Sequence, residues 1–142
     1  MSTSTPKLKL GTTILIVDDT PEIISLANRM LSYDLGATVV CAENGQVAKE
    51  KIMAQRSPFD LVFTDLEMPV MDGRQLTEWL RFTEPKTPIL MWTGNRATIT
   101  AENRPNVDVL LLKPASLDVI VGSIRALIPH CFREATVEQL PA

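Results

Sequence analysis

The sequence predicts an α/β protein in which a doubly wound parallel sheet lies between two layers of helices. Five short apolar runs alternate with stretches of helical period along the 142 residues. Each run is apolar on consecutive residues, as expected for parallel strands that helices cover on both faces. The fold class is therefore a three-layer αβα, (βα)5 arrangement, for which we expect the strand order 2-1-3-4-5. The predicted strands are residues 13–17, 37–41, 61–64, 89–92 and 109–112.

Residues that begin and end helices lie between these strands. Thr20 is predicted to cap a first helix that ends at Gly36, and Asn44 to cap a second helix that ends near residue 56. A third helix is predicted to begin near Gly73 and to end before the prolines that precede the fourth strand. The first three strands are thus each followed by a helix, as a doubly wound sheet requires.

The last two predicted helices differ in how clearly the sequence marks them. Ser116 can cap a helix over residues 117–128, whose apolar residues recur at the i, i+3, i+4, i+7 spacing. A helix is also due within residues 95–106, but residues 98–100 are β-branched, the apolar face is thin, and Pro105 interrupts it. We therefore expect only a short or mobile element between the fourth and fifth strands.

Composition and charge restrict the classes of function. Fourteen basic and seventeen acidic residues give a net charge of −3, which provides no basic field for nucleic acid. The apolar runs are far shorter than the ~20 residues that span a bilayer, so we expect no membrane partner. Cys41 and Cys131 form no CxxC pair, and we expect plain thiols in the cytoplasm. One domain, residues 12–128, is predicted between tails over residues 1–11 and 129–142.

Acidic residues follow the first and third predicted strands. Asp18 and Asp19 end the first strand, and Asp65 ends the third. In the expected order these strands are neighbours at the point where the strand order reverses, which is where such sheets bind ligands. Three carboxylates in one place repel one another, and Mg2+ relieves this repulsion because it takes oxygen ligands, often together with phosphate. The cluster therefore predicts phosphoryl chemistry rather than a structural metal.

The fourth and fifth predicted strands end in groups that can bind phosphate oxygens. Thr93 offers a hydroxyl, Gly94 a backbone that a ligand can approach closely, and Lys113 an ammonium group. Phosphoryl transfer needs mainly positioning and neutralisation of charge, which a metal, a lysine and a hydroxyl can supply. A carboxylate can itself be the nucleophile and form an acyl phosphate, and Asp65 is the candidate.

The order of these residues resembles that of response-regulator receiver domains of two-component systems, such as the chemotaxis regulators. The resemblance extends over about residues 12–128 and implies a flavodoxin-like fold. An Asp-Asp pair or a lysine at a strand end is common by itself, so the ordered set is more specific than any part of it. The signatures are Asp18-Asp19, Asp65, Met68-Pro69-Val70-Met71-Asp72-Gly73, Thr93-Gly94 and Lys113-Pro114.

The resemblance implies a role for each residue at the metal site. Asp65 would accept the phosphoryl group and also bind the metal. Asp19 would be a direct ligand, and Asp18 would bind through water. Glu67 would contribute its backbone carbonyl oxygen. The implied cofactor is Mg2+.

Further residues would bind the phosphoryl group or shape the surrounding loops. Thr93 would bond to the phosphoryl group and move towards it, Gly94 would lie beside it, and Lys113 would pair with another oxygen. Pro114 would follow a cis peptide bond that directs the lysine. The residues expected to shape the loop after the acceptor are Pro69, Asp72 and Gly73.

The resemblance also implies partners, and a signalling domain rather than an enzyme, which assists only its own phosphotransfer and dephosphorylation. A histidine kinase or a histidine phosphotransfer protein would be the donor, and an unknown downstream protein would recognise the phosphorylated form. In the family an aromatic residue on the fifth strand and a later Phe often take part in this change, where this chain has Leu110 and Ala115. We therefore expect a changed partner surface. Glu67 and Asn95 would line the route of the hydrolytic water and tune the lifetime of the acyl phosphate.

Two other functions fit parts of the sequence. A haloacid-dehalogenase-like phosphatase would use Asp65 as nucleophile and Glu67 in proton transfer, but that family has its nucleophile on the first core strand and its acidic metal pair late in the chain. A receiver-shaped binding module that works without phosphate is the second alternative, although every residue that the chemistry requires is present. A free-standing receiver, a part of a hybrid kinase and the N-terminal piece of a longer regulator all fit.

Overall fold

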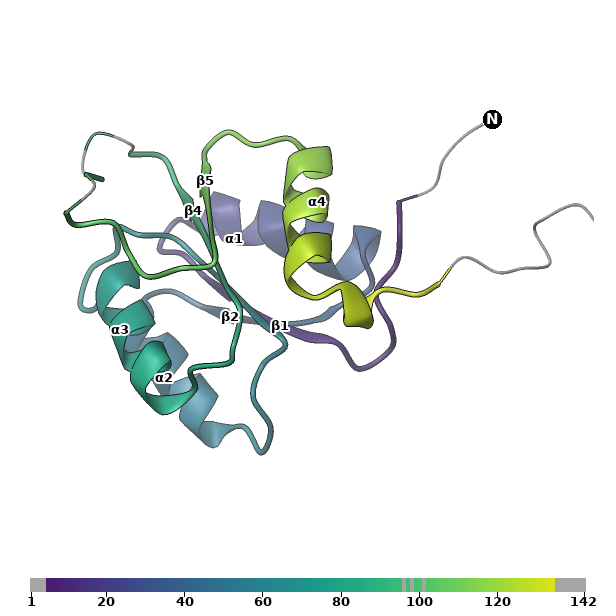
Figure 1. The fold of residues 1–142 in the computed structure, drawn as a ribbon, viewed down its shortest axis with the longest axis horizontal. Coiled ribbons are helices and arrows are strands. Elements are labelled where there is room, and N and C mark those ends of the chain that lie inside the picture. The colour runs from purple at the N-terminus through teal and green to yellow at the C-terminus, as the bar shows by residue number, and fades with distance from the viewer. Residues whose placement is uncertain (1–4, 96, 98, 101, 135–142) are drawn as a thin grey trace, which may run out of the picture.

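The computed structural model describes residues 5–95, 97, 99–100 and 102–134. Its centre is a five-stranded sheet in the order β2-β1-β3-β4-β5, and all the strand pairs are parallel (Figure 1). The predicted fold class and strand order are therefore confirmed. The second strand lies one residue later than predicted, and the fourth includes one residue more. The strands are β1 (Thr13–Val17), β2 (Thr38–Ala42), β3 (Leu61–Thr64), β4 (Ile89–Thr93) and β5 (Val109–Leu112).

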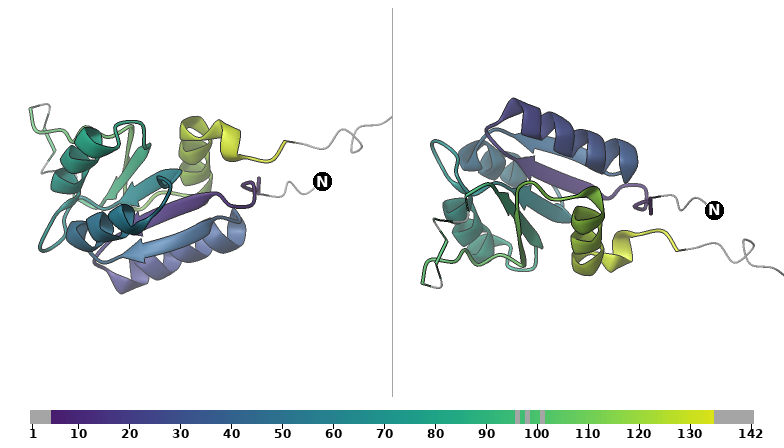
Figure 2. Two further views of the ribbon diagram at one scale, coloured as in Figure 1. Left: turned by 90° about the horizontal axis from the view of Figure 1, so that it is seen from below. Right: turned by 90° about the horizontal axis from the view of Figure 1, so that it is seen from above.

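Helices cover both faces of this sheet and divide the core into two clusters (Figure 2). The first cluster packs one face of the sheet against α1, its continuation η1 and α4, and the second packs the other face against α2 and α3. The helices are α1 (Pro21–Asn28), the π-helix η1 (Arg29–Asp34), α2 (Gly45–Ala54), α3 (Gly73–Thr83), α4 (Leu117–Leu127) and the 3-10 helix η3 (Pro129–Cys131).

Side chains cap three of these helices. Those of Asn44 and Ser116 accept hydrogen bonds from backbone N–H groups of the first turn, at 3.0 and 3.3 Å. Asp72 forms a reciprocal capping box with Gln75 at the start of α3. Thr20 lies at the predicted cap position before α1, but its side chain makes no capping hydrogen bond. The predicted helix starts are thus correct, and only the capping by Thr20 is not observed.

The segment between β4 and β5 forms no α-helix in the residues that the structure describes there. Ala97 lies in a 3-10 turn, and residues 102–103 form a turn. This agrees with a short element, for which β-branched residues and a proline are the physical cause. The chain is instead held where it re-enters the sheet, because Arg81 of α3 donates to the Asn106 carbonyl oxygen at 2.9 Å and to the Asp108 carboxylate at 3.0 Å.

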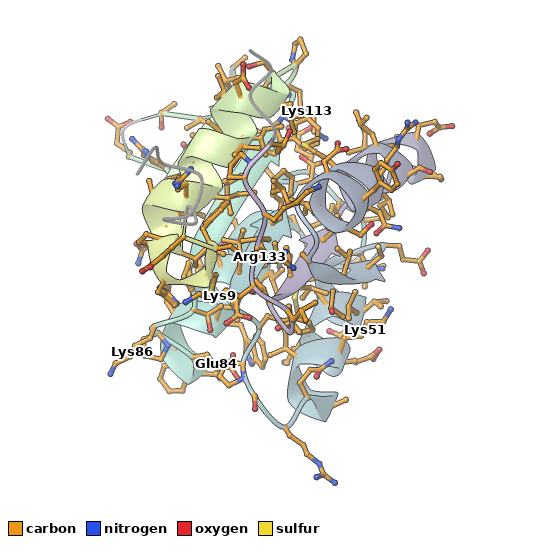
Figure 3. The ribbon with its side chains drawn as sticks, turned by 90° about the vertical axis from the view of Figure 1, so that its right-hand side faces the viewer. Lys9, Lys51, Glu84, Lys86, Lys113 and Arg133 are labelled. Atoms are coloured by element: carbon orange, nitrogen blue, oxygen red, sulfur yellow. The ribbon has the colours of Figure 1, made fainter. Side chains whose placement is uncertain are left out.

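Parts of both predicted tails pack onto the domain. Leu8 is fully buried, Phe132 is 4% exposed, and the two residues form an antiparallel bridge that belongs to the first core cluster. The backbone N–H of Lys9 donates to the Cys131 carbonyl oxygen at 2.7 Å. Figure 3 shows Lys9 and Arg133 on this side of the molecule. Two apolar side chains outside residues 12–128 thus pack in the first core cluster.

No helix in the described part of the chain is both long enough and apolar enough to cross a bilayer.

Candidate functional site

The geometry of the site begins with the pairing of β1 and β3. Val17 is opposite Thr64 in the register, and the Asp65 N–H continues the ladder by donating to the Val17 carbonyl oxygen at 2.8 Å. Asp18 and Asp65 are therefore side by side where the two strands end. The expectation that the carboxylates meet at the carboxyl edge of the sheet is correct, since parallel strands end at the same edge.

The three predicted acidic residues come together at this edge. A carboxylate oxygen from each of Asp18, Asp19 and Asp65 lies within 4.8 Å of the others. Asp18 and Asp65 are buried, whereas Asp19 is exposed. Oxygen donors at this spacing, one of them open to solvent, suit a hard divalent cation that keeps part of its water shell.

The surroundings of the Asp65 carboxyl shift its pKa upward. Its burial raises its pKa, and the neighbouring Asp18 carboxylate adds to the increase. The Lys113 ammonium and the backbone N–H of Leu66, which donates to Asp65 Oδ1 at 2.7 Å, act in the opposite direction. Ionisation of Asp65 therefore costs free energy in the folded chain, and a bound cation would reduce this cost.

Lys113 reaches the cluster from the end of β5. Its Nζ lies 2.9 Å from Asp18 Oδ2 and 3.5 Å from Asp65 Oδ2. The Lys113–Pro114 peptide bond is cis, as the resemblance implied. In Figure 3, Lys113 lies at the opposite end of the molecule from Glu84 and Lys86, which belong to the loop before β4. The lysine is thus at the acidic edge, where it neutralises part of the negative charge.

The loops after β3 and β4 meet above the site. Thr93 is buried at the end of β4, and its Oγ1 accepts the backbone N–H of Asn95 at 3.3 Å. The Asn95 side chain donates to Glu67 Oε1 at 3.0 Å. The two residues that sequence reasoning linked to the hydrolytic water are therefore in contact. At Gly94, an added Cβ would come no closer than 4.0 Å to Lys113, so packing around the residue does not require a glycine.

The loop between β3 and α3 depends on close backbone packing. A Cβ at Gly73 would lie 2.1 Å from the Asp65 carbonyl oxygen, so only glycine fits there without a shift. Asp72 caps the helix that follows. Val70 has a φ of 69°, an unusual conformation for a β-branched residue. The predicted loop-shaping role of Gly73 thus has a steric basis, while nothing in the sequence indicated the backbone of Val70.

Gly45 also positions this loop, although the sequence pattern does not mark it. A Cβ at Gly45, the first residue of α2, would lie 2.7 Å from Met71, and the Gly45 N–H donates to the Met71 carbonyl oxygen at 2.8 Å. The only local signal was a glycine beside the predicted cap Asn44. Its importance depends on a contact with a residue far along the chain, which the sequence pattern does not show.

Comparison with known proteins supports the interpretation of this edge. The family model described as response regulator receiver domain matches residues 14–125. The sensor protein GacS of Pseudomonas syringae pv. syringae is 45% identical over 110 residues, which are 72% of this chain but only 12% of the relative. The two-component response regulator ORR41 of Oryza sativa subsp. japonica is 35% identical over 118 residues, covering 79% of this chain and 93% of the relative.

Solved structures show the same fold. The receiver domain of sensor histidine kinase PA1611 from Pseudomonas aeruginosa PAO1, with a magnesium ion coordinated in the active site cleft, matches with a TM-score of 0.75 at 28% identity, over 84% of this chain and 98% of that one. The response regulator TrrA of Thermotoga maritima, in complex with Mg2+ and BeF, matches with a TM-score of 0.73 at 26% identity, over 82% and 98%. The match to the receiver family speaks against the alternative of a haloacid-dehalogenase-like phosphatase. The chain belongs to the response regulator receiver domains of two-component systems.

Proposed function

We propose that the chain accepts a phosphoryl group on Asp65 from a histidine kinase or a histidine phosphotransfer protein. The observation that carries the proposal is the meeting of three carboxylates and one ammonium group at a single edge of the sheet. The Asp65 side chain is buried and its pKa is raised, and Lys113 Nζ lies 3.5 Å from its Oδ2. These features support Asp65 as the nucleophile.

Mg2+ fits the donor set at this edge. Asp19 and Asp65 would bind the ion directly, Asp18 through water, and Glu67 through its backbone carbonyl. All of these donors are oxygens, as Mg2+ prefers, and the relative PA1611 holds a magnesium ion in its active site cleft. When bound, the ion would neutralise the carboxylates and the charge that develops on the transferred group.

The transfer itself needs little from the protein besides placement. A carboxylate oxygen of Asp65 would form a bond to phosphorus while the bond from phosphorus to the donor imidazole nitrogen breaks. The nitrogen keeps the electron pair and takes up a proton from water. Thr93, Gly94 and Lys113 would hold the phosphoryl oxygens through a hydroxyl, a backbone N–H and an ammonium group. Attack of water on phosphorus would later release inorganic phosphate and restore the carboxylate.

A direct experiment tests this function. The purified chain is incubated with acetyl phosphate and Mg2+, and its mass is measured before and after treatment with hydroxylamine. We expect the added mass of one phosphoryl group, lost with hydroxylamine and absent from the Asp65→Asn variant. An unchanged mass of the parent chain under these conditions would overturn the proposal and favour a module that works without phosphate.

The proposal includes partners and location. The donor is a histidine kinase or phosphotransfer protein, and a downstream protein binds the phosphorylated form. A net charge of −3 is consistent with the absence of direct nucleic-acid binding, and we propose a cytoplasmic location without a membrane partner. Phosphorylation and its reversal by hydrolysis would be the only chemistry of this chain.

A further inference from the structure

The Trp92 ring lies beside Lys113, one of the residues of the proposed phosphoryl site. Trp92 is the residue before Thr93 on β4 and is 4% exposed. The edge of one ring meets the face of the other where Trp92 contacts Phe63, with centroids 5.4 Å apart and an interplanar angle of 79°. The Trp92 ring is thus held by the core, and its orientation is defined by packing.

The face of this ring is turned to Lys113. The Lys113 Nζ lies 5.2 Å from the ring centroid, while the same atom is 2.9 Å from Asp18 Oδ2. The ammonium group therefore lies between two carboxylates and an indole face. Its side chain is only 17% exposed, so little water competes for it. Tryptophan is the best aromatic partner for a cation, and the attraction grows as the pair is desolvated.

The indole N–H indicates that tryptophan is not the residue that would fill this core position at the lowest free energy. Trp92 Nε1 is buried and has no hydrogen-bond partner among the described residues. A buried donor without an acceptor costs free energy that a phenylalanine at the same place would avoid. Packing alone therefore does not explain the tryptophan, whereas the cation over its face does supply a favourable contact.

We propose that Trp92 is a positioning residue that holds Lys113 beside Asp65 when Mg2+ occupies the carboxylates. The inference rests on the proposed phosphoacceptor function. Lys113 pairs with the Asp18 and Asp65 carboxylates, but a divalent cation bound to these carboxylates would compete for their oxygens and repel the ammonium group. Among the partners of the Lys113 ammonium group in the described part of the chain, the ring face is the one that the metal would not take. It keeps the ammonium group within reach of the oxygens of the incoming phosphoryl group.

The first test is the rate of phosphorylation by acetyl phosphate at saturating Mg2+. In the full chain, Trp92→Leu removes the ring face and should slow phosphorylation about fivefold, the kinetic equivalent of a cation–π contact of about 1 kcal/mol. Trp92→Phe keeps an aromatic face and should remain within about twofold of the parent. If Trp92→Leu does not fold, Trp92→Met takes its place. Equal rates for the aliphatic variant and the parent would overturn the role.

The second test separates positioning from a merely structural effect. In a Lys113→Met background there is no cation to hold, so adding Trp92→Leu should not slow phosphorylation further. A general disturbance of the site would slow both backgrounds by the same factor, and this result would refute the inference.

A third measurement does not depend on phosphorylation. Protons that lie over an aromatic face resonate upfield, so the Lys113 ε-CH2 protons should be shifted upfield in the Mg2+-loaded parent and in Trp92→Phe, and not in Trp92→Leu. If the parent chain is phosphorylated but shows no upfield shift, the positioning role of Trp92 is wrong and the proposed function stands. A parent chain that shows the shift but is not phosphorylated overturns the proposed function, and the positioning role with it.

Discussion

At the scale of single residues, the site combines groups that are unfavourable for the fold. Asp65 is a buried carboxylate beside a second one, and burial raises its pKa. Val70 carries a positive φ in the adjoining loop. Such features persist where a function requires them, and their removal usually increases stability while it removes activity.

The first prediction concerns the charge of Asp65. Because its pKa is higher in the folded than in the unfolded chain, ionisation of Asp65 opposes folding at neutral pH, and the effect disappears as the pH falls below the ordinary pKa of a carboxyl. Asp65→Asn should therefore raise the free energy of unfolding by about 1 kcal/mol at pH 7 without Mg2+. The gain over the parent should shrink towards pH 4, as measured by urea denaturation.

The metal provides the control for this prediction. Mg2+ binds only the folded site, so it should stabilise the parent more than Asp65→Asn. A variant that is less stable than the parent at pH 7 in the absence of metal would contradict the electrostatic explanation.

The second prediction concerns the lifetime of the acyl phosphate. Glu67 is exposed and accepts a hydrogen bond from Asn95, so its carboxylate lies where a water molecule could donate to it. Glu67→Gln keeps a carbonyl oxygen for Asn95 but removes the carboxylate that could take a proton from the attacking water. The substitution should therefore slow dephosphorylation severalfold. The measurement is loss of the phosphoryl mass with time after removal of acetyl phosphate. Equal rates in the variant and the parent would exclude this role.

At the scale of elements, the site depends on how helices start against the sheet edge. The first residue of α3 touches the backbone of Asp65, and the first residue of α2 touches the loop before α3. Where the fourth helix of the fold was due, the described residues form no α-helix, and Arg81 of α3 holds the chain before β5. The positions of Asp65 and Lys113 are therefore set by contacts at element ends.

The third prediction concerns the start of α3. Gly73→Ala should destabilise the fold by about 2 kcal/mol, because the new Cβ overlaps the Asp65 carbonyl oxygen and the backbone must move. The same shift should displace the carboxylate and slow phosphorylation. Thermal unfolding and the acetyl phosphate assay measure the two effects.

A second glycine provides the matched control. Gly122 lies inside α4, and a Cβ there would meet nothing within 4 Å. Gly122→Ala should raise stability by about 1 kcal/mol and leave phosphorylation unchanged. If the two substitutions had the same effect, the steric explanation of Gly73 would be wrong.

At the scale of the whole molecule, the two ends of the described chain close one side of the core. Leu8 and Phe132 lie outside residues 14–125, which match the family model, and yet both are buried in the first cluster. Figure 1 shows the two end segments side by side, away from the loops at the acidic edge. We propose that the folding unit includes both segments and that they contribute to stability rather than to phosphoryl chemistry.

The fourth prediction follows from this packing. Leu8→Ala should lower the free energy of unfolding by about 3 kcal/mol, because it removes a fully buried side chain. The rate of phosphorylation of the folded chain should stay near that of the parent. Leu10→Ala is the control, since Leu10 is 88% exposed and its loss should change stability little. Similar effects of the two substitutions would show that the N-terminal segment is not part of the core.

The amino-acid pattern was enough to predict the sheet, the strand order and the edge of the sheet at which five site residues lie. These residues are Asp18, Asp19, Asp65, Thr93 and Lys113. Consecutive apolar residues mark strands that are buried on both faces, and parallel strands end at the same edge, so residues after strands must gather there. These are rules about neighbours in the chain and about one topology, and they can be read without coordinates.

The contacts between these side chains, and the residues that support them, depend on how the elements pack together. The pairing of Lys113 with Asp18, the indole face behind it, the bond between Asn95 and Glu67, and the burial of Leu8 all join segments that are far apart in the chain. Each depends on distances of a few ångströms that follow from packing, and no local pattern of residue types carries that information. The acidic edge could thus be predicted as a set of residues, whereas its arrangement could not.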